Sequence, residues 1–281
     1  MTWPFEPVEQ TYTARDTILY ALSVGAGRDP TDGAALRFVY EERLEALPTM
    51  ALVLGWPGLW LQDPRTGVDW RRMVHGEQRL VMHAPLPVAG TVVASTRVES
   101  VVDKGAGRGA LIHTARELHD LADGTHIASQ LSTSFCRSDG GFGGPDGPVR
   151  EPHALPNRDA DVRLEVPTLP QQALLYRLNG DLNPLHVDPA AAAAAGFDRP
   201  ILHGLCTFGA VGYALLAALC ESYPLRLRAL EVRFSKPVFP GEAISVSVWH
   251  EGAGRAGFRA HVRERDVCVI DNGLCEFEPG S

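Results

Sequence analysis

The run Gly180-Asp181-Leu182-Asn183-Pro184-Leu185-His186 combines residue types and spacing that fit acid–base chemistry. An Asn-Pro turn between the carboxylate of Asp181 and the imidazole of His186 can fold both groups toward one point. Such a pair can bind a water molecule and remove its proton. A purely structural reading makes Asp181 an Asx turn and Asp188 the N-cap of the next helix. We adopt that reading for Asp188 and predict catalytic roles for Asp181, Asn183 and His186, because a turn alone needs no histidine.

His203 and Gly204 stand directly before the apolar run 205–220, which has the length and composition of a buried helix. Free N–H groups and the positive end of the helix dipole at such a start favour an oxygen that gains negative charge. The alternative is that Gly204 merely permits close packing. We expect His203 to form structural hydrogen bonds rather than to act as a catalyst.

Patterns around these residues predict helices followed by strands. Expected helices lie at 170–179, at 189–195 with Gly196 closing it, and at 205–220, and a turn is expected at 180–184. Alternation of apolar and polar residues predicts strands at 228–234, 243–250, 258–265 and 267–277. A buried helix followed by a meander of strands indicates an α+β fold, with an antiparallel sheet wrapped around the helix.

The first half carries a faint repeat of this pattern, at a shift of about 150 residues, which suggests duplicated domains. Expected strands lie at 78–82, 91–102, 110–120 and 126–136. The counterpart of the long helix, at 47–54, is short and interrupted by Pro48, Gly55 and Pro57. Glycine and proline without apolar periodicity mark residues 138–159 as a linker. We therefore expect an N-terminal unit at 1–137 and a C-terminal unit at 160–281.

The run 176–186 resembles the hydratase 2 motif of the MaoC-like (R)-specific enoyl-CoA hydratases, and the run 201–206 resembles the second signature of that family. His75-Gly76-Glu77-Gln78, Asp103-Lys104-Gly105 and the glycine run 140–144 are similar to the hydratase 2 part of peroxisomal multifunctional enzymes type 2. The resemblance spans nearly the whole chain. It implies a double hotdog fold in which the C-terminal repeat alone keeps the catalytic motif, while the broken helix of the first repeat leaves room for a bulky acyl group.

The resemblance also implies the reaction and the remaining site residues. It indicates reversible hydration of trans-2-enoyl-CoA to (3R)-3-hydroxyacyl-CoA, in fatty acid or steroid side-chain β-oxidation, with the Gly204 N–H holding the thioester oxygen. It assigns His75, Gly76 and Lys104 to the CoA portion and places Phe234 and Lys236 beside the same ligand. The structural alternatives are a solvated hairpin lysine at Lys104 and a core side chain at Phe234.

Composition excludes several other classes of protein. A net charge of -8 without a basic block argues against nucleic-acid binding, and no apolar stretch approaches the length of a membrane span. The five cysteines contain no C-x-x-C pair, so a disulfide framework and a zinc site are not expected. No dinucleotide fingerprint, P-loop or G-x-S-x-G elbow occurs, so we expect no cofactor. His186 to Asp188 with His203 suggests a metal site, but no further ligand cluster supports one.

We expect a cytoplasmic enzyme that pairs as a homodimer, because no leader or C-terminal peroxisomal signal is recognisable and hotdog proteins commonly associate. Two other functions stay open at this point. One is a non-catalytic acyl-CoA-binding subunit, and the other is a thioesterase on the same architecture. The preferred acyl group is also open.

Overall fold

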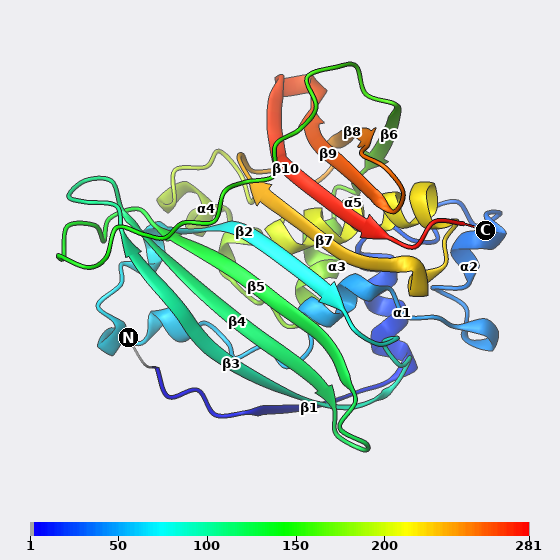
Figure 1. Cartoon of the computed structure of the whole chain (residues 1–281), viewed down its shortest axis with the longest axis horizontal. Helices are drawn as coiled ribbons and strands as arrows, with labels where there is room; N and C mark the ends of the chain where they lie inside the picture. The colour runs from blue at the N-terminus through cyan, green and yellow to red at the C-terminus, as the bar shows by residue number, and fades with distance from the viewer. Residues whose placement is uncertain (1–2, 281) are drawn as a thin grey trace.

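Ten strands form one antiparallel sheet in the order β1-β3-β4-β5-β2-β7-β10-β9-β8-β6 (Figure 1). The computed structural model describes residues 3–280. The strands are β1 (Val8–Tyr12), β2 (Met73–Met82), β3 (Gly90–Asp103), β4 (Ala110–Asp120), β5 (His126–Cys136), β6 (Val162–Pro167), β7 (Leu227–Phe234), β8 (Ala243–His250), β9 (Arg255–Val262) and β10 (Val267–Phe277).

The helices lie behind the sheet in the view of Figure 1. The α-helices are α1 (Ala14–Ser23), α2 (Gly33–Leu36), α3 (Gln172–Tyr176), α4 (Pro189–Ala194) and α5 (Gly204–Cys220). Short 3-10 helices are η1 (Glu41–Arg43), η2 (Pro48–Leu52), η3 (Trp60–Gln62), η4 (Pro64–Thr66), η5 (Trp70–Arg72), η6 (Arg177–Asn179), η7 (Pro184–His186), η8 (Pro224–Arg226) and η9 (Arg263–Arg265). No helix within residues 3–280 is both long and apolar enough to cross a bilayer.

The two halves of the sheet repeat one topology. From its outer edge inward, the first half runs β1-β3-β4-β5-β2 and the second runs β6-β8-β9-β10-β7. The central strands β2 and β7 pair antiparallel, with Glu77 opposite Arg233 and Leu80 opposite Leu230, so one continuous sheet serves both halves. This is the double hotdog arrangement expected from the sequence.

The long helix α5 lies at the centre of the core, where glycines let the first half approach it closely. A Cβ atom on Gly209 would lie 2.6 Å from Val24 Cγ1 and 2.8 Å from the Tyr20 hydroxyl. A Cβ atom on Gly212 would lie 2.9 Å from Thr49 Cγ2. These separations are shorter than van der Waals contact, so α1 and η2 pack against α5 only because residues 209 and 212 have no side chain.

The segment at 47–54, expected to be a short and interrupted counterpart of the long helix, forms the 3-10 helix η2 with Pro48 at its first position. Its free carbonyl groups are bound by side chains of the sheet. Arg116 Nη2 donates to the Leu52 carbonyl at 2.6 Å, and Gln130 Nε2 donates to the Ala51 carbonyl at 2.7 Å. Burial lowers the pKa of Arg116 to about 10. A buried guanidinium therefore holds the segment in place.

Several expected boundaries were wrong. Strands β1 and β6 were not expected, because each is a short edge strand of five or six residues whose apolar pattern is weak. The strand expected at 258–265 is β9, Arg255–Val262, because residues 263–265 form the turn η9 before β10. Helix α3 ends at Tyr176 and tightens into η6 instead of continuing to 179 as an α-helix.

Residues 138–159 connect β5 to β6 without a helix or strand. The Gly140 to Gly144 run, which lies in the expected linker, closes over the carboxylate of Asp103 at the end of β3. The Gly141 and Gly143 N–H groups donate to it at 2.6 and 2.8 Å, and such hydrogen bonds hold the pKa of Asp103 below its ordinary value. The division at 137 and 160 stays a prediction.

Candidate active site

The turn after η6 sets the positions of Asp181 and Asn183. Gly180 ends η6 with a φ of 116°, a left-handed conformation that glycine adopts without strain. Asp181 Oδ1 then accepts a hydrogen bond from the Asn183 N–H at 3.2 Å, and Asn183 Oδ1 accepts one from the Leu185 N–H at 3.1 Å. The Asx turn is therefore present, and it engages one carboxylate oxygen of Asp181.

His186 is held in one tautomer by the backbone. Its Nδ1 lies 2.8 Å from the Ile201 carbonyl oxygen, which can only accept, so Nδ1 carries the proton and Nε2 keeps its lone pair. The residue is 9% exposed. Burial lowers the pKa of His186, against the opposing effects of the Ile201 hydrogen bond and the Asp181 charge. A neutral imidazole with a bare Nε2 is the form that can take a proton from water.

His203 occupies the N-cap position of α5, and its ring stacks on that of His186, with ring centroids 3.7 Å apart and planes at 27°. Its Nε2 donates to the Asp181 carbonyl oxygen at 3.2 Å. Burial and the neighbouring His186 lower the pKa of His203 to about 3. The side chains of Asp181, His186 and His203 bring their nitrogen and oxygen donor atoms within 4.8 Å of one another.

Two imidazoles and a carboxylate are also donor types that bind transition metals. His186 Nε2 and His203 Nδ1 carry the lone pairs, because the opposite ring nitrogens donate to backbone carbonyl groups. The expectation of a reaction without metal therefore stays a prediction. Asp188, close in sequence, has a different role: its Oδ1 caps α4 through the Ala190 N–H at 2.8 Å.

Two buried tyrosines, which the sequence reasoning did not place in the site, lie behind the imidazoles. The Tyr176 ring centroid lies 4.9 Å from that of His203, and Tyr20 from α1 follows at 6.2 Å from Tyr176. Burial raises the pKa of both hydroxyl groups. The signal was present in the repeat, since Tyr20 and Tyr176 occupy matching positions in Ile18–Leu22 and Leu174–Leu178. Each half of the chain thus supplies one tyrosine to the aromatic layer behind the two imidazoles.

His75 reaches this region from the first half, across the β2–β7 pairing. Its Nε2 donates to the Glu77 carbonyl oxygen at 3.0 Å, and its ring centroid lies 5.0 Å from that of Phe234. Burial lowers the pKa of His75 to about 4, while the charge of Asp181 acts in the opposite direction. A register shift of the β2–β5 ladder occurs between His75 and Glu77, at Gly76. Such a bulge redirects neighbouring side chains.

Gly204, at the first position of α5, lies under the ring of Phe234. A Cβ atom on Gly204 would lie 3.6 Å from two ring carbons of Phe234, which is ordinary contact. The aromatic ring therefore covers the start of α5 from the side of the sheet. Lys236 follows Phe234 by two residues and is exposed.

Lys104 lies at the same end of the sheet as His75 but far across it. The ladder runs from Asp103 to Ala110, on to Cys136, and then to Met73. Three strand spacings make this roughly 14 Å. Lys104 itself is exposed in the turn between β3 and β4. The structure thus groups His75, Gly204 and Phe234 near the cluster of Asp181, His186 and His203, which we call the candidate acid–base cluster. Lys104 is left at a distance suited to a long ligand.

Both halves of the chain match known protein families. The model described as MFE-2 hydratase 2 N-terminal domain matches residues 10–138, and the one described as MaoC like domain matches residues 152–272. The 3-hydroxyacyl-thioester dehydratase Y of Mycobacterium tuberculosis is 39% identical, over 98% of this chain and 96% of that protein. Enoyl-CoA hydratase ChsH3 of the same organism is also 39% identical, over 95% of this chain and 93% of that protein.

Solved structures agree with these sequence matches. The MaoC-like dehydratase from Phytophthora capsici superposes with a TM-score of 0.87 at 34% identity, covering 98% of this chain and 95% of that chain. The run 176–186, which contains Asp181 and His186, lies inside the matched MaoC-like region. The likeness in sequence and structure extends over both halves of the sheet, and the chain belongs to the MaoC-like dehydratase family, in the form that carries a hydratase 2 N-terminal domain.

Proposed function

We propose that this chain is an (R)-specific enoyl-CoA hydratase, which adds water reversibly to trans-2-enoyl-CoA and forms (3R)-3-hydroxyacyl-CoA. The observation that carries the proposal is the pairing of the Asp181 carboxylate with a His186 ring whose Nε2 is left bare by the Ile201 carbonyl. The names of the family members, an enoyl-CoA hydratase and a 3-hydroxyacyl-thioester dehydratase, describe the two directions of this reaction.

In the proposed mechanism, one water molecule is bound between the Asp181 carboxylate and His186 Nε2. Its oxygen forms a bond to C3, its proton passes to this pair, and the carbon–carbon π electrons move toward the thioester. The Gly204 N–H, free at the start of α5, donates to the thioester oxygen as it gains negative charge. A proton then passes to C2, so that one water molecule has been added in total. Asn183 maintains the turn that carries the pair.

The remaining site residues are proposed to bind the substrate. Phe234 lies over Gly204, and His75 lies beside Phe234 with Gly76 next to it on β2. These residues would border the thioester and pantetheine, while Lys236 follows on the exposed side. Lys104 would meet a phosphate of CoA, because it stands at the same end of the sheet and is exposed. Only an extended ligand can contact both Lys104 and the acid–base pair.

The acyl group is proposed to extend toward η2. Pro48 lines a groove with a volume of about 350 Å³, together with apolar residues that include Met82, Leu86 and Leu225. The groove lies beside η8, which follows the end of α5, whereas Gly204 is at the start of α5, so only a long acyl group could reach it. We therefore propose that long or branched acyl groups are accepted, and that fatty acid or steroid side-chain intermediates are the substrates.

One assay separates the proposal from its alternatives. We would follow the ultraviolet absorbance of a trans-2-enoyl-CoA together with release of free thiol. A hydratase removes the absorbance of the conjugated thioester without releasing thiol. Loss of absorbance with equal thiol release would identify a thioesterase, and no change would leave only acyl-CoA binding. Either of these two results contradicts the proposal.

Pairing into a homodimer and a cytoplasmic location are also proposed. All five cysteines are free, which suits a reducing compartment. Sedimentation equilibrium of the purified chain tests the first point, since a homodimer has twice the monomer mass of 30.4 kDa. A single species at the monomer mass would contradict it.

A further inference from the structure

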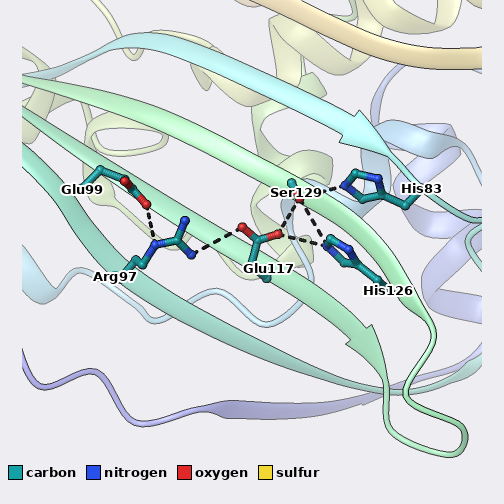
Figure 2. Close-up of polar contacts among 6 residues, drawn as sticks. All are labelled: His83, Arg97, Glu99, Glu117, His126 and Ser129. Carbon is teal, nitrogen blue, oxygen red and sulfur yellow. Dashed lines mark hydrogen bonds and ion pairs between the residues drawn. The ribbon is translucent and has the colours of Figure 1, made fainter.

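Three histidine rings stack on the face of the sheet that points away from the helices. His126, at the start of β5, lies between His83, which follows β2, and His119, near the end of β4. Ring centroids are 4.1 Å apart for His83 and His126, and 4.6 Å apart for His119 and His126. Figure 2 shows His83 and His126 on this face, with Ser129 and Glu117 beside them. The cluster is separate from the acid–base site.

A β-bulge places His126 in this cluster. In the β4–β5 ladder Leu118 faces Ala128, but the next pair is His119 with His126. A regular ladder would have put Ile127 opposite His119 and would have turned His126 to the inner face. The bulge instead keeps both Ile127 and Ala128 buried, at 1% and 0% exposure. It turns His126 outward beside His119, because a bulge changes the face of the sheet to which a side chain points.

The polar atoms of the cluster form one compact group. Glu117 Oε2 accepts from Ser129 Oγ at 2.5 Å and lies 3.0 Å from His126 Nε2. Ser129 Oγ lies 2.8 Å from His83 Nε2 and 3.3 Å from His126 Nε2. Two ligands of one tetrahedral zinc ion are roughly 3.3 Å apart, given bonds of about 2.0 to 2.1 Å. Glu117 Oε2 and His126 Nε2 thus already have nearly the spacing of two metal ligands. His83 Nε2 is linked to them through Ser129 Oγ, and its side chain would move closer to bind the same ion.

The charges of the group suit a cation at neutral pH. Burial opposes ionisation of Glu117, but hydrogen bonds from Ser129 and His126 outweigh it and hold the pKa of Glu117 below its ordinary value. Burial and the neighbouring His126 lower the pKa of His83. Arg97 is the neighbouring cation, and it lies 3.4 Å from Glu117 Oε1 while it also pairs with Glu99 (Figure 2). Oε2 faces the histidines.

We propose that Glu117, His126 and His83 form a binding site for a divalent transition-metal ion of the class that prefers imidazole ligands, with Zn²⁺ as its representative. His119 stacks on His126 and supplies a further imidazole after rotation of its ring. Binding displaces the protons now shared within the group, because a metal takes neutral imidazole and ionised carboxylate. The ion would join the β2–β3 connection to β4 and β5 on the outer face of the first repeat.

The test is calorimetric titration of the full-length chain with Zn²⁺ in a buffer that does not bind metal, at about pH 7.5. We expect saturable binding that weakens by at least about tenfold in each of His126→Ala, His83→Ala and Glu117→Gln. His250→Ala, which removes an exposed histidine on β8, is the matched control and should bind as the wild type does.

A second titration separates this site from the acid–base cluster, which also contains metal-binding donor types. His186→Ala removes a donor there and should leave the outer site intact. Binding that disappears in His186→Ala but persists in His126→Ala would overturn the proposal. So would an absence of saturable binding in the wild type, or equal affinity in His126→Ala.

Thermal unfolding gives an independent readout. An ion that binds only the folded chain raises the melting temperature in a concentration-dependent way. We expect this rise with Zn²⁺ for the wild type and for His250→Ala, and none for His126→Ala. The melting temperature of each variant without metal shows that it is folded. An equal rise in His126→Ala and the wild type would contradict the assignment of the ligands.

Discussion

The stacked rings of His186 and His203 donate from opposite ring nitrogens. His186 donates from Nδ1 to the Ile201 carbonyl, whereas His203 donates from Nε2 to the Asp181 carbonyl. The rings lie 3.7 Å apart, and both are buried. The backbone therefore gives two adjacent imidazoles different tautomers, and His203 fixes the chain at Asp181 while His186 presents a bare nitrogen. This difference leads to distinct expectations for the two residues.

Replacing the proposed base should abolish most of the turnover. His186→Ala and Asp181→Asn should each lower kcat by roughly 10²- to 10⁴-fold, because a general acid–base group commonly contributes that much. Steady-state kinetics on an enoyl-CoA measures this effect. His203→Gln is the matched control, since its amide can still donate to the Asp181 carbonyl, and it should keep far more activity. Similar losses in all three variants would contradict the separate roles.

Acid should destabilise the fold through its buried histidines. An unfolded imidazole binds a proton near its ordinary pKa of 6.5, whereas the pKa values of His203 and His75 in the folded chain are about 3 and 4. Between these pH values the unfolded chain binds more protons, so the free energy of unfolding falls as the pH falls. For His203 alone the loss at pH 5 is roughly 2 kcal/mol.

Urea denaturation between about pH 7 and pH 5 measures that slope. Replacing one histidine removes its contribution to this pH dependence. The free energy of unfolding of His75→Gln should therefore fall less over the same pH interval. An unchanged pH dependence in this variant would show that His75 takes up its proton equally in the folded and unfolded chain.

Lys104→Ala should raise KM for a CoA thioester much more than it lowers kcat. The proposed phosphate contact lies far from the reacting carbon, since Asp103 beside Lys104 is three strand spacings, roughly 14 Å, from Met73 on β2. Such a contact binds the ground state and the transition state alike. The comparison substrate is the pantetheine thioester, which lacks the nucleotide phosphates and should show no penalty. Equal penalties on the two substrates would remove Lys104 from the CoA site.

Arg116→Leu should destabilise the first repeat. The change leaves the Leu52 carbonyl and the Gln130 side-chain oxygen buried without this donor, and each such group costs about 1 to 3 kcal/mol. The free energy of unfolding in urea should fall accordingly. Arg255→Leu, at a half-exposed arginine whose ion pair with Glu276 spans 3.9 Å, is the control and should cost less than about 1 kcal/mol. Equal costs would show that η2 does not depend on Arg116.

Local patterns in the sequence were sufficient to predict the bounds of several helices and strands. The strands expected at 110–120, 126–136, 243–250 and 267–277 have the same bounds in the structure, because polar, glycine or proline turn residues flank each apolar-rich run. The helix expected at 205–220 was predicted to within one residue, because its apolar run is long. It begins at Gly204. The Asx turn at Asp181 and the helix cap at Asp188 were also readable, because both depend on residues two positions apart.

Contacts between distant segments could not be read in this way. The approach of His75 to Phe234 depends on the register of β2 against β7, which no local pattern encodes. The same holds for Tyr20 beside Tyr176, and for the bulge that turns His126 outward. Catalytic and substrate-binding roles stay predictions, because they depend on a ligand as well as on the chain.

The most direct test of the central claim is to identify the product formed from a trans-2-enoyl-CoA by the wild type and by Asp181→Asn. In deuterated water the wild type should give (3R)-3-hydroxyacyl-CoA with deuterium at C2 and with the thioester intact, and Asp181→Asn should give little product. Chiral chromatography with mass spectrometry reads both features. A (3S) product, free CoA, or undiminished product formation by Asp181→Asn would contradict the account.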